Sequence, residues 1–527
     1  MSLSSGKQRT VATIISWLNI VLQIAISIFF VPFFLKTVGD KQYGLYSFSL
    51  SIISWIDTLI VAIGASYYKF LAREKTDYGD DGESRAIGVF FKIFGLVALS
   101  ILVFGVVFDV LIYCNVIKLS EYTSEETLQI AAIVLASVVS ASLTSFLTVG
   151  KSYPYYKEKF IFVYSLAFIQ IVLQTSLSIL VLKLGYGVTF VAIAHFASLA
   201  VVSFLQFAFS RFKFGMRISL VSRTPEDKKY RKRLFREILQ FTLFVLLITV
   251  VDVVNKNIDK VLLGFYNADL VATYQLSLTI PSYLISFTSI ITVLFTPQVN
   301  QEYSKHCSDS LIDETFRKCS KIQTILTFLI VGGFLAVGRE FVLLWLDEEH
   351  LSVFYFSSIL MVLYSFTCSN ALNTIIRATK NVHRKASFVY LGILALNIMI
   401  SFLCLQLLPK EQAIWSCLIG TIVSYLIGQF VVMQIYDYKV TKLRTDKFFA
   451  DYLIYLGFAL ACAVLFYVMG FAIDYDSHLL VSLLAKGVLY ILLFGAFVFL
   501  KDRKFVSMFF KMLFERRKKG SETQQDQ

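Results

Sequence analysis

The chain contains about fourteen long apolar stretches separated by short polar segments, and this pattern limits its fold more than any other feature. A helix needs roughly 20 mostly apolar residues to cross a hydrocarbon core about 30 Å thick. The runs are too continuous for barrel strands, which alternate over about 10 residues. We therefore predict an all-α polytopic membrane protein with spans at residues 11–35, 43–66, 87–115, 127–149, 160–183, 187–210, 238–264, 270–296, 321–346, 353–376, 386–408, 412–435, 449–473 and 479–500.

The composition argues against an enzyme. Hydrophobic residues make up 57% of the 527 residues and charged residues only 16%, whereas a soluble chain carries about 25% charged residues. Gly150-Lys151-Ser152 resembles the end of a phosphate-binding loop, but position 145 is Ser where that motif needs Gly. Most of the seven cysteines lie inside spans, with no spacing typical of a metal site. We expect no catalytic residue, no cofactor and no metal, apart from a coupling proton or sodium ion.

The distribution of Lys and Arg predicts the orientation of the chain. If the N-terminus is cytoplasmic, 39 of the 49 basic residues fall on the inner side, six on the outer side and four within spans. Basic residues are retained on the cytoplasmic side of a membrane. Both termini are therefore expected in the cytoplasm. The net charge of +13 is then explained by this topology and by anionic membrane lipids, and no nucleic acid is implied.

A weak internal repeat suggests that the chain has two related halves. Tyr46–Ile52 resembles Tyr274–Ile280, and Phe162-Val163-Tyr164 recurs as Phe388-Val389-Tyr390. The two offsets, 228 and 226, are nearly equal and each covers six spans. An even number of spans gives both copies the same orientation, so the repeat is parallel.

This repeat predicts two six-helix lobes followed by two additional helices. Two lobes with a cleft between them are the design of an alternating-access transporter. The expected parts are an N-terminal lobe (1–210), a basic cytoplasmic linker (211–237), a C-terminal lobe (238–440), two further transmembrane helices (441–500) and a basic cytoplasmic tail (501–527).

Several short motifs resemble those of the Wzx-type polysaccharide or O-antigen flippases. They are Val38-Gly39 followed by Tyr43-Gly44-Leu45-Tyr46, the pattern Asp252…Asp259-Lys260-x-Leu-Leu-Gly264 followed by Tyr274, and Leu344-Trp345-Leu346-Asp347. That family belongs to the multidrug/oligosaccharidyl-lipid/polysaccharide (MOP) exporter superfamily. The resemblance implies two lobes in a V shape and export of an undecaprenyl-pyrophosphate-linked oligosaccharide across the bacterial inner membrane. It also implies polymerase or glycosyltransferase partners of the same pathway. We expect a monomer.

The predicted helix 238–264 carries most of the charge inside the membrane. Asp252, Lys256 and Lys260 are spaced four residues apart and share a face, with Asn255 and Asp259 beside it. Charges at such depth are costly and usually face water or a partner. One interpretation is a cavity in which Lys256 attracts the pyrophosphate while Asp252 or Asp259 positions it or binds a cation. The other is that these charges pair to make the helix insertable, with Lys260 extending to the surface.

Other polar residues in the spans are candidates for the same cavity or for ion coupling. Asn370 and Arg377 could form an inner gate or act as ordinary helix-end residues, and His195 could be a proton site or a packing contact. Pro281 could be a hinge or a static kink. Lys486 is expected to extend to the outer surface. The candidates for the cavity or the ion site are completed by Asp57, Asn19 and Gln23.

The favoured function is a flippase for a lipid-linked oligosaccharide. The alternatives are a cation-coupled multidrug and toxin extruder of the same superfamily and a flippase for the peptidoglycan lipid precursor. The extruders often have a carboxylate in the first helix, where this chain has Asn19 and Gln23. A polymerase or ligase would need a large outer loop, and the longest outer segment, 116–126, is short.

Overall fold

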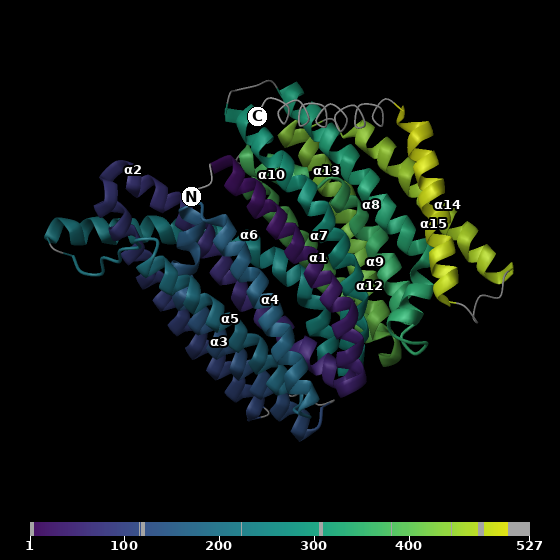
Figure 1. The fold of residues 1–527 in the computed structure, drawn as a ribbon, viewed down its shortest axis with the longest axis horizontal. Coiled ribbons are helices and arrows are strands. Elements are labelled where there is room, and N and C mark those ends of the chain that lie inside the picture. Colours follow the sequence, from purple (N-terminus) through teal and green to yellow (C-terminus); the bar gives the residue numbers. More distant parts are fainter. Residues whose placement is uncertain are drawn as a thin grey trace, which may run out of the picture. The chain divides into compact units, whose positions relative to one another are not determined.

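The computed structural model describes residues 5–114, 116, 122–222, 224–304, 309–380, 382–443, 445–472 and 479–503 (Figure 1). Some side chains within helices also lie outside the described set: those of residues 5–10, 13, 52–65, 243–253, 255–256, 293–294, 297, 300–301, 304, 309, 383–384, 411 and 470–472.

Every regular element in the described ranges is a helix. They are α1 (Ser5–Val38), α2 (Asp40–Tyr113), α3 (Ser124–Tyr156), α4 (Phe160–Lys183), α5 (Val188–Phe212), α6 (Pro225–Gly264), α7 (Ala268–Ser304), α8 (Asp309–Trp345), α9 (Ser352–Ser369), α10 (Leu372–Thr379), α11 (His383–Leu407), η1 (Lys410–Gln412), α12 (Ala413–Tyr425), η2 (Leu426–Val432), α13 (Met433–Tyr436), η3 (Asp437–Thr441), α14 (Asp446–Ala472) and α15 (Leu479–Lys501).

The helices confirm the predicted all-α polytopic fold. Eleven helical segments among the described residues are long and apolar enough to cross a membrane. The three predicted spans outside that set, 43–66, 238–264 and 270–296, coincide with the helical backbone of α2, α6 and α7. The chain is therefore a multi-pass membrane protein.

Two helices are longer than the sequence pattern indicates. α2 joins the second and third predicted spans through the predicted loop 67–86, with a single non-helical residue, Gly79 (φ 63°, ψ −147°). α6 begins inside the predicted linker, where Thr224 accepts a hydrogen bond from the Asp227 N–H and Pro225 occupies the first turn. Hydropathy marks only the apolar part of a helix, so these polar extensions were predicted as loops.

The chain divides into two compact units. Unit 1 comprises residues 1–276 and 383–433, and unit 2 comprises residues 277–382 and 434–527. The predicted second lobe, 238–440, thus contributes helices to both units. The internal repeat and the lobe boundaries stay predictions, as does the hinge at Pro281. That proline lies within α7, about one turn after the unit boundary between Leu276 and Ser277.

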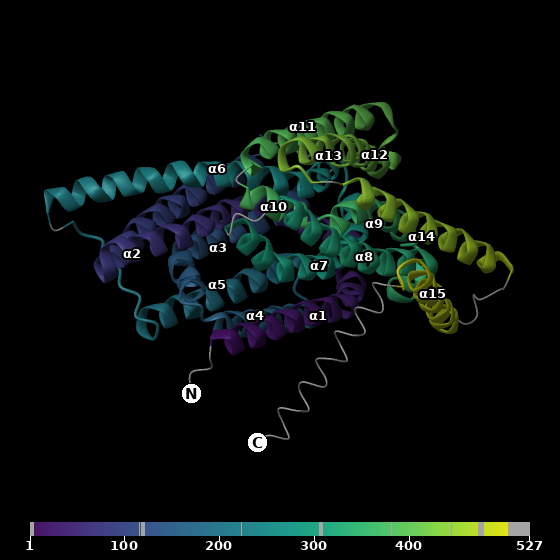
Figure 2. The same ribbon diagram turned by 90° about the horizontal axis from the view of Figure 1, so that it is seen from above.

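In unit 1, α2 packs against both α3 and α6 and so links the other helices. α3 and α4 both pack against α5, and α1 packs against α4 (Figure 1). α11 packs against α12 and α6 (Figure 2). In unit 2, α8 is the central element because α9, α14 and α15 all pack against it.

The polar extensions of α2 and α6 are tied together within unit 1. The Arg73 guanidinium donates to the buried Glu74 and, at 3.1 Å, to Glu237 of α6. Arg233 binds the other oxygen of Glu237 at 2.8 Å, and the Tyr230 hydroxyl donates to Glu74 at 2.7 Å. The predicted basic linker is therefore largely an ordered helix packed on α2.

Candidate functional site

Only part of the charged face predicted in helix 238–264 can be described. Asp252, Asn255 and Lys256 lie in the helical backbone of α6, but their side chains fall outside the described residues. The same holds for Asp57 in α2. The roles predicted for these four residues therefore stay predictions.

Asp259 lies at the centre of a buried polar cluster in unit 1. Its side chain is 4% exposed. One carboxylate oxygen, Oδ2, accepts hydrogen bonds from the Tyr274 hydroxyl of α7 at 2.7 Å and from the Thr421 hydroxyl of α12 at 2.6 Å. The consecutive helices α6 and α7 thus meet α12, which is distant in sequence, at one carboxylate.

α11 adds amide and hydroxyl groups to this cluster. The Asn397 amide nitrogen lies 3.5 Å from the Thr421 hydroxyl oxygen, and the Ser401 hydroxyl donates to the Asn397 amide oxygen at 3.1 Å. The second oxygen of Asp259, Oδ1, is buried without a hydrogen-bond partner among the described residues. A buried carboxylate oxygen left in this state is costly and can be satisfied by a proton or a small cation.

Lys260 follows Asp259 directly and points to a different partner. Its ammonium group donates to the Gln275 side-chain oxygen of α7 at 3.0 Å. Residues i and i+1 of a helix do not face each other. Asp259 and Lys260 therefore contact α7 separately, through Tyr274 and Gln275. Both contacts hold α6 against the first turns of α7.

The chemistry of this cluster suits a hard monovalent cation or a proton. Carboxylate, hydroxyl and amide oxygens are the ligands that hard cations prefer. No group of three or more His, Cys, Asp or Glu side chains suited to a transition metal occurs in the described part of the chain. The cluster resembles neither a nucleophile triad nor a zinc site.

Asn19, Gln23 and His195 lie on other helices of unit 1, namely α1 and α5. Asn19 is buried and its amide donates to the Tyr164 carbonyl of α4 at 2.9 Å, whereas Gln23 is exposed. His195 is half-buried in α5, and its Nδ1 is buried without a partner among the described residues. Asn370 ends α9 and its backbone N–H donates to Phe366.

Arg377 belongs to a separate buried cluster in unit 2. Its guanidinium nitrogen Nη1 lies 3.0 and 2.9 Å from the two carboxylate oxygens of Asp437, and the Asn373 amide donates to Asp437 at 3.0 Å. Arg377 is 5% exposed and Asp437 is completely buried. Arg377 therefore has a carboxylate partner, Asp437, which was not among the predicted site residues and lies just beyond the predicted span 412–435.

Unit 2 contains a second buried ion pair that was not predicted from the sequence. Lys486 of α15 pairs with Glu340 of α8, and both side chains are buried. The expectation that Lys486 extends to the outer surface is wrong, because an acidic partner on the neighbouring helix satisfies the ammonium group. The sequence contains one indication of this pair: Glu340 and Lys486 have opposite charges, and each lies near the predicted outer end of an apolar span.

Two of the three glycines in the predicted flippase motifs, Gly44 and Gly264, mark close helix contacts in unit 1, whereas a Cβ on Gly39 would meet nothing within 4 Å. A Cβ atom on Gly44 would lie 1.8 Å from the Ala268 carbonyl oxygen at the start of α7. A Cβ atom on Gly264 would lie 2.0 Å from the Phe48 ring. The Tyr122 hydroxyl donates to the Gly264 carbonyl. These motif residues therefore position α2 against the ends of α6 and α7, next to Asp259.

Comparison with known proteins shows the fold and a similarity to one protein family. The model of a family described as polysaccharide biosynthesis protein matches residues 94–355. The lipid II flippase MurJ, solved in an inward closed conformation, superposes with a TM-score of 0.65 at 14% identity, covering 94% of this chain and 100% of that chain. No curated protein matches by sequence.

Two multidrug transporters share the same fold. An inward-facing MATE family transporter of the MOP superfamily gives a TM-score of 0.57 at 14% identity, covering 80% of this chain and 95% of that one. The MATE transporter DinF-BH, in complex with R6G, gives 0.56 at 16% identity, covering 83% and 96%. The family model and these folds agree with the motif resemblance. The chain is similar to polysaccharide biosynthesis proteins over residues 94–355, just under half of its length, and it has the fold that these flippase and transporter structures share.

Proposed function

We propose that this transporter moves an undecaprenyl-pyrophosphate-linked oligosaccharide repeat unit from the cytoplasmic to the outer face of a bacterial inner membrane. The match to polysaccharide biosynthesis proteins over residues 94–355 carries this proposal, because it distinguishes surface-glycan export from the other cargoes of this fold. The charged headgroup would cross by alternating access while the polyprenyl tail stays in lipid. Both termini would then be cytoplasmic.

The cargo is tested in cells that lack the gene. Polyprenyl-linked glycans would be extracted, and the leaflet of each would be determined with a membrane-impermeant glycan label. A complete repeat unit that accumulates on the cytoplasmic face would support the proposal. Accumulation of the peptidoglycan lipid precursor would support the alternative flippase. An unchanged lipid pool with altered sensitivity to cationic drugs would contradict a flippase and favour an extruder.

Lys256 remains the residue proposed to attract the pyrophosphate. Lys256→Ala should abolish export without loss of folded protein, and Lys256→Arg should retain some activity because a cation is kept at the same position. Export would be measured by surface glycan per cell, with protein quantified by fluorescence-detected size exclusion. Wild-type export by Lys256→Ala would refute this assignment.

We also propose that transport is coupled to a proton or sodium ion at Asp259. The support is a buried carboxylate with one unsatisfied oxygen, surrounded by Tyr274, Thr421 and Asn397. Asp259→Asn keeps the shape of the side chain and removes its charge. In proteoliposomes, this variant should lose any dependence of transport on a sodium or proton gradient.

Asp109 provides a matched control for this test. It is a buried aspartate of α2, 9% exposed, with an unsatisfied Oδ1 of its own. Asp109→Asn should leave the ion dependence unchanged. If Asp259→Asn retains the wild-type ion dependence, or if Asp109→Asn removes it equally, Asp259 is not the coupling residue.

A further inference from the structure

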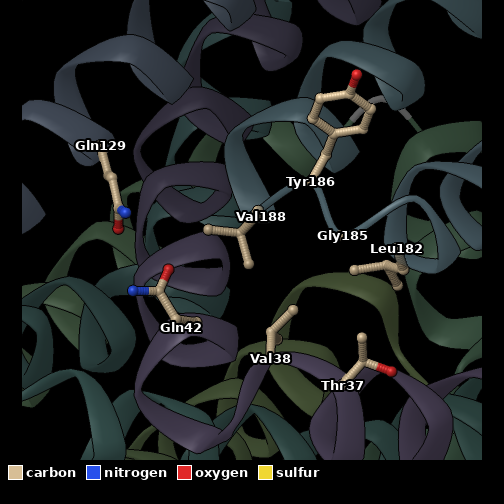
Figure 3. Close-up of a pocket in the computed structure, with 9 residues that line it drawn as sticks. Thr37, Val38, Gln42, Gln129, Leu182, Gly185, Tyr186 and Val188 are labelled. Atoms are coloured by element: carbon tan, nitrogen blue, oxygen red, sulfur yellow. The ribbon is translucent and has the colours of Figure 1, made fainter.

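A cavity in unit 1 lies apart from the Asp259 cluster and has no role in the mechanism above. It has a volume of about 250 Å³ and lies where the end of α1, the start of α2, α3, the end of α4 and the start of α5 meet (Figure 3). Its lining residues are Thr37, Val38, Gln42, Gln129, Leu182, Gly185, Tyr186, Gly187 and Val188.

The polar side chains of the cavity are neutral. The Gln129 side-chain oxygen is buried without a hydrogen-bond partner, and no hydrogen bond involves the Gln42 amide among the described residues. The Thr37 hydroxyl, in contrast, donates to the Phe33 carbonyl of its own helix. The Gln129 oxygen is enclosed by protein atoms, so a ligand in the cavity would be stabilised by the amide nitrogen of Gln129 and by the amide of Gln42.

The lining argues for a particular class of ligand. None of the nine lining residues carries a formal charge, so neither a metal ion nor a phosphate finds a counter-charge in it. The neighbouring Lys41 ammonium is paired with Glu126. A primary amide both donates and accepts hydrogen bonds, as two adjacent hydroxyl groups of a sugar require.

The shape of the cavity fits the same class. In Figure 3 the two amides lie on one side of the cavity, and the ring of Tyr186 points away from the other labelled side chains. Val38, Leu182 and Val188 supply apolar surface. A pyranose has both faces that such a lining needs, namely equatorial hydroxyls and an apolar C–H surface. Pockets of this kind combine an apolar lining with a few polar groups that fix orientation.

We infer that this cavity is a carbohydrate subsite that binds one pyranose ring of the cargo through Gln42 and Gln129. The inference rests on the proposed function for the source of the sugar. The predicted topology places the segments 36–42 and 183–187 on the outer side of the membrane. The subsite would therefore bind the glycan where the headgroup is delivered, before it leaves the transporter.

The test measures sugar binding to the purified full-length protein. Saturation-transfer difference NMR would be recorded with glucose, galactose, N-acetylglucosamine and rhamnose, in a detergent that has no sugar headgroup. The variants are Gln42→Leu and Gln129→Leu, which keep the side-chain volume and remove the amide. Gln174→Leu, at a half-buried glutamine in the middle of α4, away from the cavity lining, is the matched control. Val188→Trp fills the cavity and serves if Gln129→Leu fails to fold.

We expect at least one pyranose to bind the wild type. Each glutamine variant should weaken its affinity about 3- to 10-fold, the effect of losing one or two hydrogen bonds to neutral groups. Gln174→Leu should bind as the wild type does. Absence of binding by every pyranose, or equal binding by wild type, Gln42→Leu and Val188→Trp, would overturn the inference.

The result is separable from the proposed function. If deletion of the gene causes a lipid-linked glycan to accumulate but no pyranose binds, the subsite is refuted and the flippase stands. If a pyranose binds through Gln42 and Gln129 but no glycan accumulates, the subsite stands and the proposed cargo is refuted.

Discussion

Replacing Arg377 by Leu should be among the most destabilising changes in unit 2. The substitution leaves the Asp437 carboxylate completely buried, with only the Asn373 amide donating to it at 3.0 Å. Removing one partner of a buried ion pair costs about 3–5 kcal/mol, because the remaining charge has neither water nor a counter-ion. This corresponds to an increase of roughly 10²- to 4 × 10³-fold in the unfolding equilibrium constant.

The partner substitution should rescue most of that loss. Arg377→Leu combined with Asp437→Leu removes both charges, and buried pairs replaced by apolar side chains are often neutral or stabilising. The double variant should therefore be more stable than Arg377→Leu alone by at least about 2 kcal/mol, since only the Asn373 hydrogen bond is lost in addition. Such non-additivity is the expected signature of two residues in direct contact.

The assay is reversible unfolding in mixed dodecylmaltoside and SDS micelles, followed by tryptophan fluorescence. Lys318→Leu is the control in the same unit, because its ion pair with Glu314 at 2.8 Å is exposed on both sides. Exposed pairs contribute little, so this variant should show no measurable loss. If Arg377→Leu is as stable as Lys318→Leu, or if the double variant is less stable than either single variant, the role assigned to this pair is refuted.

Two further predictions follow from unit 1. Gly44→Ala should destabilise the protein by about 1–3 kcal/mol or more, because its Cβ would overlap the Ala268 carbonyl. Gly95→Ala has open space around its Cβ and should stabilise the protein by about 0.5–1 kcal/mol. Equal unfolding midpoints for the two variants would contradict this packing. The hydrogen bond and charge of Arg233 lower the pKa of Glu237 below its ordinary value of 4.5, so the stabilisation is present above that value and is lost as pH falls through the lowered pKa. Wild type should exceed Glu237→Gln in thermal stability at neutral pH and converge with it in acid, and a pH-independent difference would refute this linkage.

Much of the architecture could be predicted from hydropathy and the distribution of Lys and Arg. The boundaries within 67–86 and 211–237 could not, because the polar extensions of α2 and α6 are held by contacts such as Arg73 to Glu237. Mean hydropathy over a window indicates whether a segment enters lipid. It does not indicate whether the polar residues next to that segment form a helix that packs against another helix. For the candidate site, Asp259 was predicted, but its hydroxyl partner Thr421 lies 162 residues away.

The sequence by itself determined that this chain spans a membrane many times and that its charged helix at 238–264 carries chemistry of interest. Both conclusions depend on the free energy of transferring a segment from water to lipid, which is a sum of contributions from about 20 consecutive residues. Only the tertiary structure decided which charges are paired, as for Arg377 with Asp437 and Lys486 with Glu340. It also decided which buried oxygens lack a hydrogen-bond partner among the described residues, as for Gln129 and one oxygen of Asp259, because those states depend on which helices meet at a given depth.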